Sequence, residues 1–157
     1  RLICVGHGKI LPELKQLAKD LGVEDRVEFT GLVDRDRIFD YVKQFDIALQ
    51  PAVTAYASPL KLFEYLANAC LVIAPSSNNI LEIIDENSAV LFDPSDDAGF
   101  EKALFHALDN IDELAGTRAA AREVIYAKKY TWQGNARRVV ELAQLDIAER
   151  HESLGRS

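Results

Sequence analysis

The residues best placed to do chemistry in this sequence lie on one short, otherwise apolar stretch. From Leu60 to Asn68, the strongly polar side chains are Lys61, Glu64 and Asn68, spaced i, i+3 and i+7. On a helix this spacing gathers them into one narrow stripe. A lysine there could hold an anion, and a carboxylate could accept hydrogen bonds from hydroxyl groups. The alternative is an ordinary solvated stripe on a surface helix.

The expected start of this helix favours an anionic ligand. Ser58 is a residue type that caps unsatisfied amides, and Pro59 suits the first helical position. Lys61 falls in the first turn, where a cation is disfavoured by roughly 0.3–1 kcal/mol. We expect the free amides of residues 60–62 to bind a diphosphate, which would remove this conflict. Glu64, further along the helix, could then accept hydrogen bonds from a ribose diol.

Strand-like and helix-like patterns alternate along most of the chain, which is typical of a parallel α/β sheet. Strands are predicted at 2–5, 27–30, 47–49, 71–74 and 89–92. Helices are predicted at 11–21, 38–45, 58–68, 80–84, 100–108, 114–127 and 139–147. We predict an α/β fold with a Rossmann-like doubly wound parallel sheet flanked by helices and extra C-terminal helices. One domain is expected over residues 1–149, with a frayed tail over 150–157.

Composition excludes several other classes of protein. The formal net charge is -7, so the overall field would repel nucleic acid rather than attract it. No apolar run approaches the ~20 residues that a membrane-spanning helix needs. Cys4 and Cys70 lack metal-ligand spacing, and no set of histidines completes a metal site. We therefore expect no metal, no nucleic-acid partner and no transmembrane segment, and the buried thiols favour a reducing cytosol.

Four collinear segments resemble glycosyltransferase family 4 (group 1). Residues 58–67, SPLKLFEYLA, resemble the family's donor-binding helix SPLKLFEYMA. In the family's order, residues 5–8 followed by 12–14 resemble VGDG…PEL, residues 25–33 resemble DRVEFTGxV, and residues 130–132 resemble YSW. The resemblance spans nearly the whole chain. It implies the C-terminal, nucleotide-sugar-binding domain of a GT-B glycosyltransferase whose first βα unit is missing from this sequence.

The resemblance implies roles for the residues on the donor-binding helix. Glu64 matches the second glutamate of the family's E-x7-E motif, which binds the ribose hydroxyls of the nucleotide. Ser58, Leu60 and Lys61 fall where the donor diphosphate meets the start of the helix. For Glu64, the alternative is a simple ion pair with Lys61 at i-3.

Further candidates for donor binding lie outside the helix. Val33 falls where the family packs its nucleobase, although an ordinary core valine is the alternative. Gly6 and His7 lie in the segment that resembles VGDG, and a solvated loop histidine is the alternative for His7. Tyr56 stands eight residues before Glu64, where the family has the first glutamate, which touches the donor sugar. Recognition of the sugar is therefore open.

The resemblance also implies an enzyme larger than this chain. In the family, an acceptor domain and a diphosphate-clamping arginine and lysine precede the segments that this chain matches. We expect a retaining, metal-independent, hexosyltransferase-type enzyme without a cofactor, using a uridine- or guanosine-diphosphate sugar in cell-surface polysaccharide biosynthesis. We expect it to be cytoplasmic and to contact the inner face of the membrane through the missing domain. No residue of this chain is assigned to catalysis, and the chain alone is expected to be inactive.

Two alternatives remain open. One is a degenerate, non-catalytic module for nucleotide binding or scaffolding, favoured by Tyr56 and by Asn78-Asn79, which replace a glycine-rich turn of the family. The other is a nucleotide-sugar epimerase of the same architecture. The late aromatic segment at residues 130–132 fits the transferases better.

Overall fold

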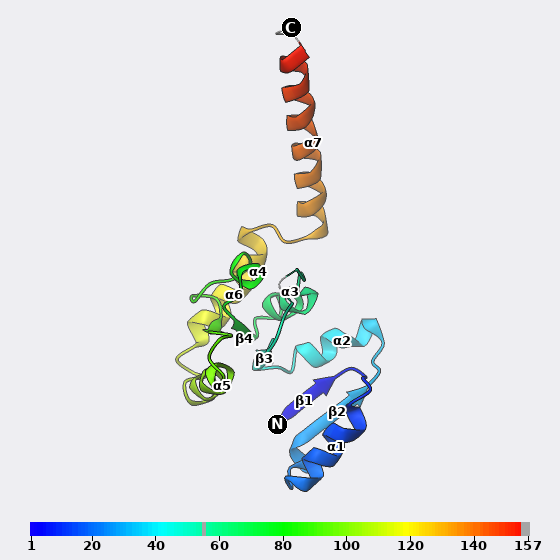
Figure 1. Ribbon diagram of the computed structural model, residues 1–157, viewed down its shortest axis with the longest axis vertical. Coiled ribbons are helices and arrows are strands. Elements are labelled where there is room, and N and C mark those ends of the chain that lie inside the picture. The colour runs from blue at the N-terminus through cyan, green and yellow to red at the C-terminus, as the bar shows by residue number, and fades with distance from the viewer. Residues whose placement is uncertain (55, 155–157) are drawn as a thin grey trace. The chain divides into compact units, whose positions relative to one another are not determined.

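The structure is a computed structural model that describes residues 1–54 and 56–154, with side chains as far as residue 146 (Figure 1). The chain divides into two compact units, Arg1–Phe45 and Asp46–Ser157. Within the described residues, hydrogen bonds join the strands into two separate parallel sheets. The predicted class, parallel sheets flanked by helices, is confirmed. The prediction of one domain over residues 1–149 stays a prediction.

The first unit is built on a parallel pair of strands. Its elements are β1 (Leu2–Val5), α1 (Leu11–Asp20), the 3-10 turn η1 (Glu24–Arg26), β2 (Val27–Gly31) and α2 (Arg35–Val42). Leu2 pairs with Val27, and the register shifts between Cys4 and Val5. The second helix, predicted at 38–45, begins and ends three residues earlier than expected.

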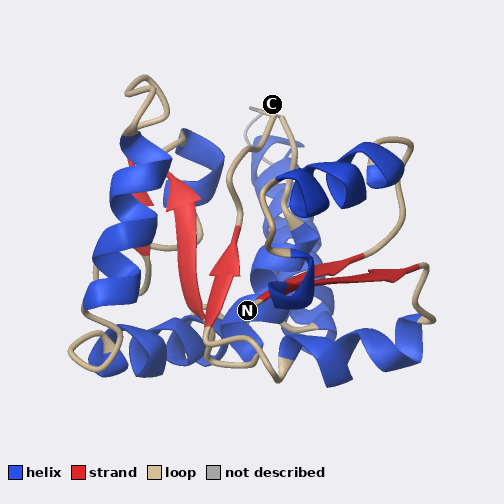
Figure 2. Ribbon diagram, turned by 90° about the horizontal axis from the view of Figure 1, so that it is seen from below, coloured by secondary structure: helices blue, strands red, loops and turns tan. Residues whose placement is uncertain are grey.

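The second unit contains a three-stranded parallel sheet in the order β3-β4-β5. Its elements are β3 (Ile47–Leu49), α3 (Leu60–Ala67), β4 (Leu71–Pro75), α4 (Asn78–Leu81), β5 (Val90–Phe92), α5 (Gly99–Asp109), α6 (Ala115–Ala127) and α7 (Trp132–Leu154). Figure 2 shows the strands and the helices that connect them. Each predicted strand of this unit agrees with the structure to within one residue.

Helices cover both faces of the central strand β4, as a doubly wound sheet requires. All five residues of β4 are buried, and alternate side chains point to opposite faces of a strand. Val72 and Ala74 pack in a core cluster with residues of α3 and α6, while Leu71 and Ile73 pack in a second cluster with residues of α5. The near-continuous apolar run of β4 reflects this double burial.

Two helix boundaries differ markedly from the prediction. α4 begins at Asn78 and ends at Leu81, although a helix was expected at 80–84. Ile83 and Ile84 are buried just beyond its end, so their apolar pattern reflects the core rather than a helix. α7 begins at Trp132, where the Gly134 amide donates to Thr131 Oγ1 at 3.0 Å and caps the helix.

The C-terminal end of the chain bears on one prediction. The first two turns of α7 carry few apolar residues, so periodicity predicted only its middle, at 139–147. The α7 backbone continues to Leu154, and residues 155–157 lie outside the described part. The frayed tail at 150–157 therefore stays a prediction.

Candidate functional site

The amino end of α3 lies at the carboxyl edge of the three-stranded sheet, as the order of elements predicts. β3 ends at Leu49, and Leu71, the first residue of β4, pairs with Ile47, the first residue of β3. The chain leaves one edge of the sheet after β3 and returns to the opposite edge for β4, so α3 runs back along the strands. This carboxyl edge is where doubly wound sheets bind their ligands.

The start of α3 differs from the prediction in its capping residue. The helix begins at Leu60 with Pro59 in the N-cap position, and no side chain of the described residues caps it. The Leu62 amide donates to the Pro59 carbonyl at 2.9 Å, so the first turn closes on Pro59 and Ser58 lies outside the helix. The expectations that Ser58 caps the helix, that Pro59 is its first residue and that Leu62 has a free amide were therefore wrong. The amides of Leu60 and Lys61 have no partner in the described part of the chain and remain available to an anion.

The polar stripe of α3 is partly exposed. Lys61 is exposed and Glu64 is half-buried, and the two form no ion pair within the described residues. The Asn68 side chain donates to the Glu64 carbonyl at 2.8 Å and so belongs to the end of the helix. Glu64 therefore presents a carboxylate that no described side chain engages through a hydrogen bond, one turn beyond Lys61.

Other side chains at the start of α3 are strongly exposed. Tyr56 is 92% exposed and Leu60 is 74% exposed, and Ser58 is also exposed. The core therefore does not cover the apolar side chain of Leu60. Leu62 and Leu66, two and six residues after Leu60, are fully buried and anchor the helix in the core.

The loop between β3 and α3 is held by two side-chain amides whose roles were not predicted. Asn79 Nδ2 donates to the carbonyls of Ala57 at 2.7 Å and Thr54 at 3.1 Å. Gln50 Nε2 donates to the Ala52 carbonyl at 2.7 Å, while its buried Oε1 has no hydrogen-bond partner among the described residues. Asn79 lies in the segment that replaces a glycine-rich turn of the family, and that departure was the one available signal.

The candidates in the first unit share one edge of its sheet. β1 ends at Val5 and β2 at Gly31 in a parallel pair, so Gly6, His7 and Val33 follow the carboxyl ends of their strands. Gly6 has φ of 128° and Gly31 has φ of 69°, conformations that favour glycine. His7 is exposed and Val33 is half-buried. These three candidates belong to the first unit, and the candidates on and before α3 belong to the second.

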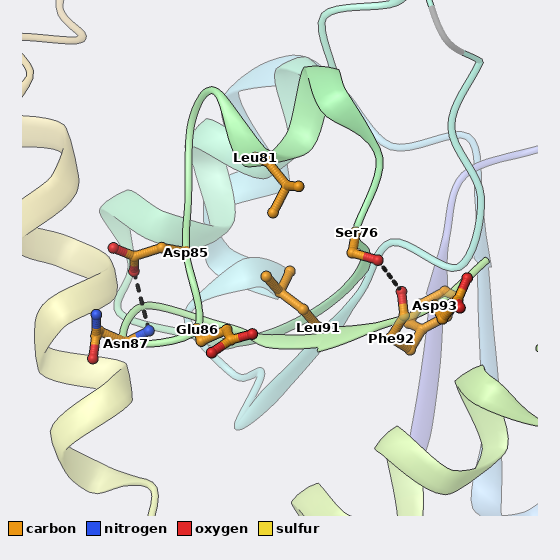
Figure 3. Close-up of a pocket in the computed structure, with 8 residues that line it drawn as sticks. All are labelled: Ser76, Leu81, Asp85, Glu86, Asn87, Leu91, Phe92 and Asp93. Atoms are coloured by element: carbon orange, nitrogen blue, oxygen red, sulfur yellow. Dashed lines mark hydrogen bonds between the residues drawn. The ribbon is translucent and has the colours of Figure 1, made fainter. Parts of the chain in front are cut away.

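A hollow of about 510 Å³ in the second unit involves none of the predicted residues (Figure 3). Its lining residues are Ser76, Leu81, Asp85, Glu86, Asn87, Leu91, Phe92 and Asp93. A hydrogen bond from the Ser88 hydroxyl lowers the pKa of Asp85, and one from Ser95 lowers the pKa of Asp93. Both carboxyls are therefore ionised at neutral pH, so this hollow is unsuited to a diphosphate.

The described residues contain no cluster of acidic, histidine and cysteine side chains that could hold a metal ion. Within the same residues, no helix has the length and apolar character needed to cross a membrane. Burial raises the pKa of Cys70 to about 11, which Arg118 opposes and Asp46 assists. Burial also raises the pKa of Cys4. Both thiols are therefore protonated at neutral pH and poor nucleophiles.

Comparison with known proteins identifies the family. The sequence profile described as Glycosyl transferases group 1 matches residues 1–110, which is more than half of the chain. The chain belongs to this family. A GDP-mannose-dependent alpha-(1-6)-phosphatidylinositol monomannoside mannosyltransferase of Mycobacterium tuberculosis is 28% identical over 156 residues, which cover 95% of the chain and 40% of that protein. D-inositol 3-phosphate glycosyltransferase 2 of Catenulispora acidiphila is 28% identical over 148 residues, which cover 92% of the chain and 34% of that protein.

Solved structures of glycosyltransferases share the fold of this family member. Sucrose-phosphate synthase from Thermosynechococcus elongatus matches with a TM-score of 0.74 at 21% identity, covering 94% of this chain and 39% of that one. Anabaena Alr3699/HepE in complex with UDP matches with a TM-score of 0.73 at 18% identity, covering 90% of this chain and 40% of that one. The chain thus spans about 40% of the length of these relatives.

Proposed function

We propose that this chain is the donor-binding half of a glycosyltransferase that moves a sugar from a nucleoside-diphosphate sugar to an acceptor such as a glycan or a lipid. The observation that carries the proposal is the amino end of α3. It presents two amides that are free within the described residues, at Leu60 and Lys61, and an exposed lysine at the carboxyl edge of a parallel sheet. The UDP complex of Anabaena Alr3699/HepE and the GDP-mannose dependence of the mycobacterial relative support this ligand class.

Each group at this end of α3 has a role in the proposal. The amides of Leu60 and Lys61, together with the lysine ammonium, would hold the diphosphate. Glu64, half-buried and without an ion pair in the described part, would accept hydrogen bonds from the ribose hydroxyls. Gly6, His7 and Val33, which belong to the first unit, stay predictions for donor binding.

Finer features of the proposed enzyme rest on the family resemblance. We propose a retaining reaction that needs no metal ion, with the acceptor bound by a separate domain. On this basis the chain alone binds donor weakly and transfers no sugar. A cytoplasmic location and a role in polysaccharide biosynthesis also stay predictions.

Isothermal titration of the chain with UDP, GDP and ADP tests the proposal. At least one of the three should bind with millimolar affinity or better. Glu64→Ala should weaken that binding about tenfold, the order expected for lost hydrogen bonds to a charged group. Glu101→Ala is the matched control, since it removes a carboxylate from α5, an element separate from α3. Absence of binding by all three nucleotides at high concentration refutes the proposal.

A non-catalytic binding module is the second candidate. Tyr56 favours it, because this exposed aromatic side chain replaces the glutamate that touches the donor sugar in the family. The test is to assay the full-length protein for transfer and for slow hydrolysis of the nucleotide sugar that carries the tightest-binding base. Nucleotide binding without turnover of any nucleotide sugar would favour the module over the enzyme.

A further inference from the structure

We propose that Asn79 is a positioning residue that holds the loop leading into α3 and thereby sets the diphosphate-binding end of this helix. The inference rests on the proposed function, since it concerns the same site. Asn79 belongs to α4, which follows β4, whereas the loop follows the neighbouring strand β3. The side chain therefore joins two segments at the carboxyl edge of the sheet.

The hydrogen bonds of Asn79 use its side-chain amide fully. Its two N–H groups face two carbonyls, those of Ala57 at 2.7 Å and Thr54 at 3.1 Å. The Ser77 hydroxyl donates to Asn79 Oδ1 at 2.8 Å. The two carbonyls can only accept, so they require the amide nitrogen on their side. Only a side chain with two donors and one acceptor satisfies all three partners.

Core packing next to Asn79 fixes the backbone from which its side chain extends. The next residue, Ile80, is fully buried in the core cluster with Leu62 and Leu66 of α3. The loop ends at Pro59, which is buried and whose carbonyl receives the first hydrogen bond of α3. Because Ala57 precedes Pro59 by two residues, the bond to Asn79 holds the chain just before the helix begins.

Few other contacts hold the described part of this loop close to α3. Thr54, Tyr56 and Ser58 are exposed, while Val53 is half-buried and packs against the core cluster. Gln50, which is 5% exposed, binds the Ala52 carbonyl at the other end of the loop. Without Asn79, the segment before α3 therefore loses its link to α4, and the amides of Leu60 and Lys61 lose a fixed direction.

Asn79→Asp tests this role with little change in shape. A carboxylate offers no hydrogen to the two carbonyls and repels them, while it still accepts from Ser77. Asn78→Asp is the matched control, because Asn78 is a neighbour in the same turn with no hydrogen bond from its side chain to described residues. Both variants add one negative charge at nearly the same place.

Two readouts follow the loop and the site separately. Hydrogen exchange at the Ala57 amide, which donates to the Thr54 carbonyl at 3.0 Å, should become about tenfold faster in Asn79→Asp and stay unchanged in Asn78→Asp. The affinity for UDP should fall about tenfold in Asn79→Asp relative to Asn78→Asp, as expected when two hydrogen bonds worth a factor of a few each are lost. Asn79→Gln keeps both donors and should recover part of each effect.

The outcomes separate this inference from the proposed function. If the wild-type chain binds UDP and the two aspartate variants behave alike, Asn79 is not a positioning residue. Faster exchange at Ala57 with unchanged affinity also overturns the inference, because the loop would then not set the site. Recovery by Asn79→Gln in both readouts supports it. If the wild-type chain binds neither UDP nor another nucleoside diphosphate, the proposed function fails first, and the inference fails with it.

Discussion

Reversing the charge of Lys61 should stabilise the fold and weaken nucleotide binding, two effects of opposite sign. Lys61 is the second residue of α3, is exposed, and forms no ion pair in the described part of the chain. A cation at a helix amino end is unfavourable by roughly 0.3–1 kcal/mol, and an anion there is favourable by a similar amount. In the described part of the chain, no side chain caps α3 to reduce this effect. We therefore expect Lys61→Glu to raise the free energy of unfolding by about 1 kcal/mol.

The same change should oppose a bound diphosphate. Two unit charges about 4 Å apart interact by about 1 kcal/mol in largely aqueous surroundings. Reversal from +1 to -1 replaces an attraction of this size with a repulsion, so the affinity for UDP or GDP should fall at least tenfold. A residue that serves only as a solvated surface lysine would show the gain in stability without the loss of binding.

Urea denaturation and isothermal titration measure the two effects on the same protein. Arg122→Glu is the matched control, because it reverses an exposed charge in the middle of α6, away from either helix end. The control should change neither quantity by more than about 0.5 kcal/mol. Lower stability of Lys61→Glu than of the control would refute the argument from the uncapped helix end. Unchanged nucleotide affinity would refute the placement of the diphosphate.

Two further predictions concern the core around α3. Leu66→Ala should lower the free energy of unfolding by about 2–5 kcal/mol, because Leu66 of α3 is fully buried against the sheet. The control is Leu142→Ala on the exposed side of α7, which should change the free energy of unfolding by less than about 1 kcal/mol in the same urea titration. Burial raises the pKa of Cys70 from 9.0 to about 11, so folding favours the protonated thiol. The contribution of this thiol to the free energy of unfolding is fully present below pH 9. It should be lost, on the order of 2 kcal/mol, as the pH rises from about 9 to about 11, and the loss should be absent from Cys70→Ala. If the free energy of unfolding changes with pH in the same way in the wild type and in Cys70→Ala, this prediction is wrong.

Most secondary-structure elements were predictable because their signals are local. Alternation of apolar runs located every strand to within one residue, and Gly22, with φ of 63°, ends α1 where the pattern stops. The apolar pattern was misleading where buried residues lie outside a helix. Ile83 and Ile84 continue the apolar spacing beyond α4, but they fill the core from a turn.

The candidate site was predictable in position but not in detail. The order β3, loop, α3 places the amino end of α3 at the carboxyl edge of any parallel sheet. Ser58 has the composition of a capping residue, yet the turn closes one residue later, on Pro59. Whether Glu64 pairs with Lys61 also depends on side-chain geometry that spacing alone leaves open, and the described residues show the two without an ion pair.

The sequence by itself determined the types of element, their order and the family, because periodicity and motif spacing are properties of neighbouring residues. Only the tertiary structure decided which residues hold the loop before α3. The hydrogen bonds from Asn79 reach residues 22 and 25 positions away. They exist because β3 and β4 pair side by side and bring the ends of both strands together. No local pattern contains that pairing, so the departure from the glycine-rich turn at Asn79 did not show which segment its side chain holds.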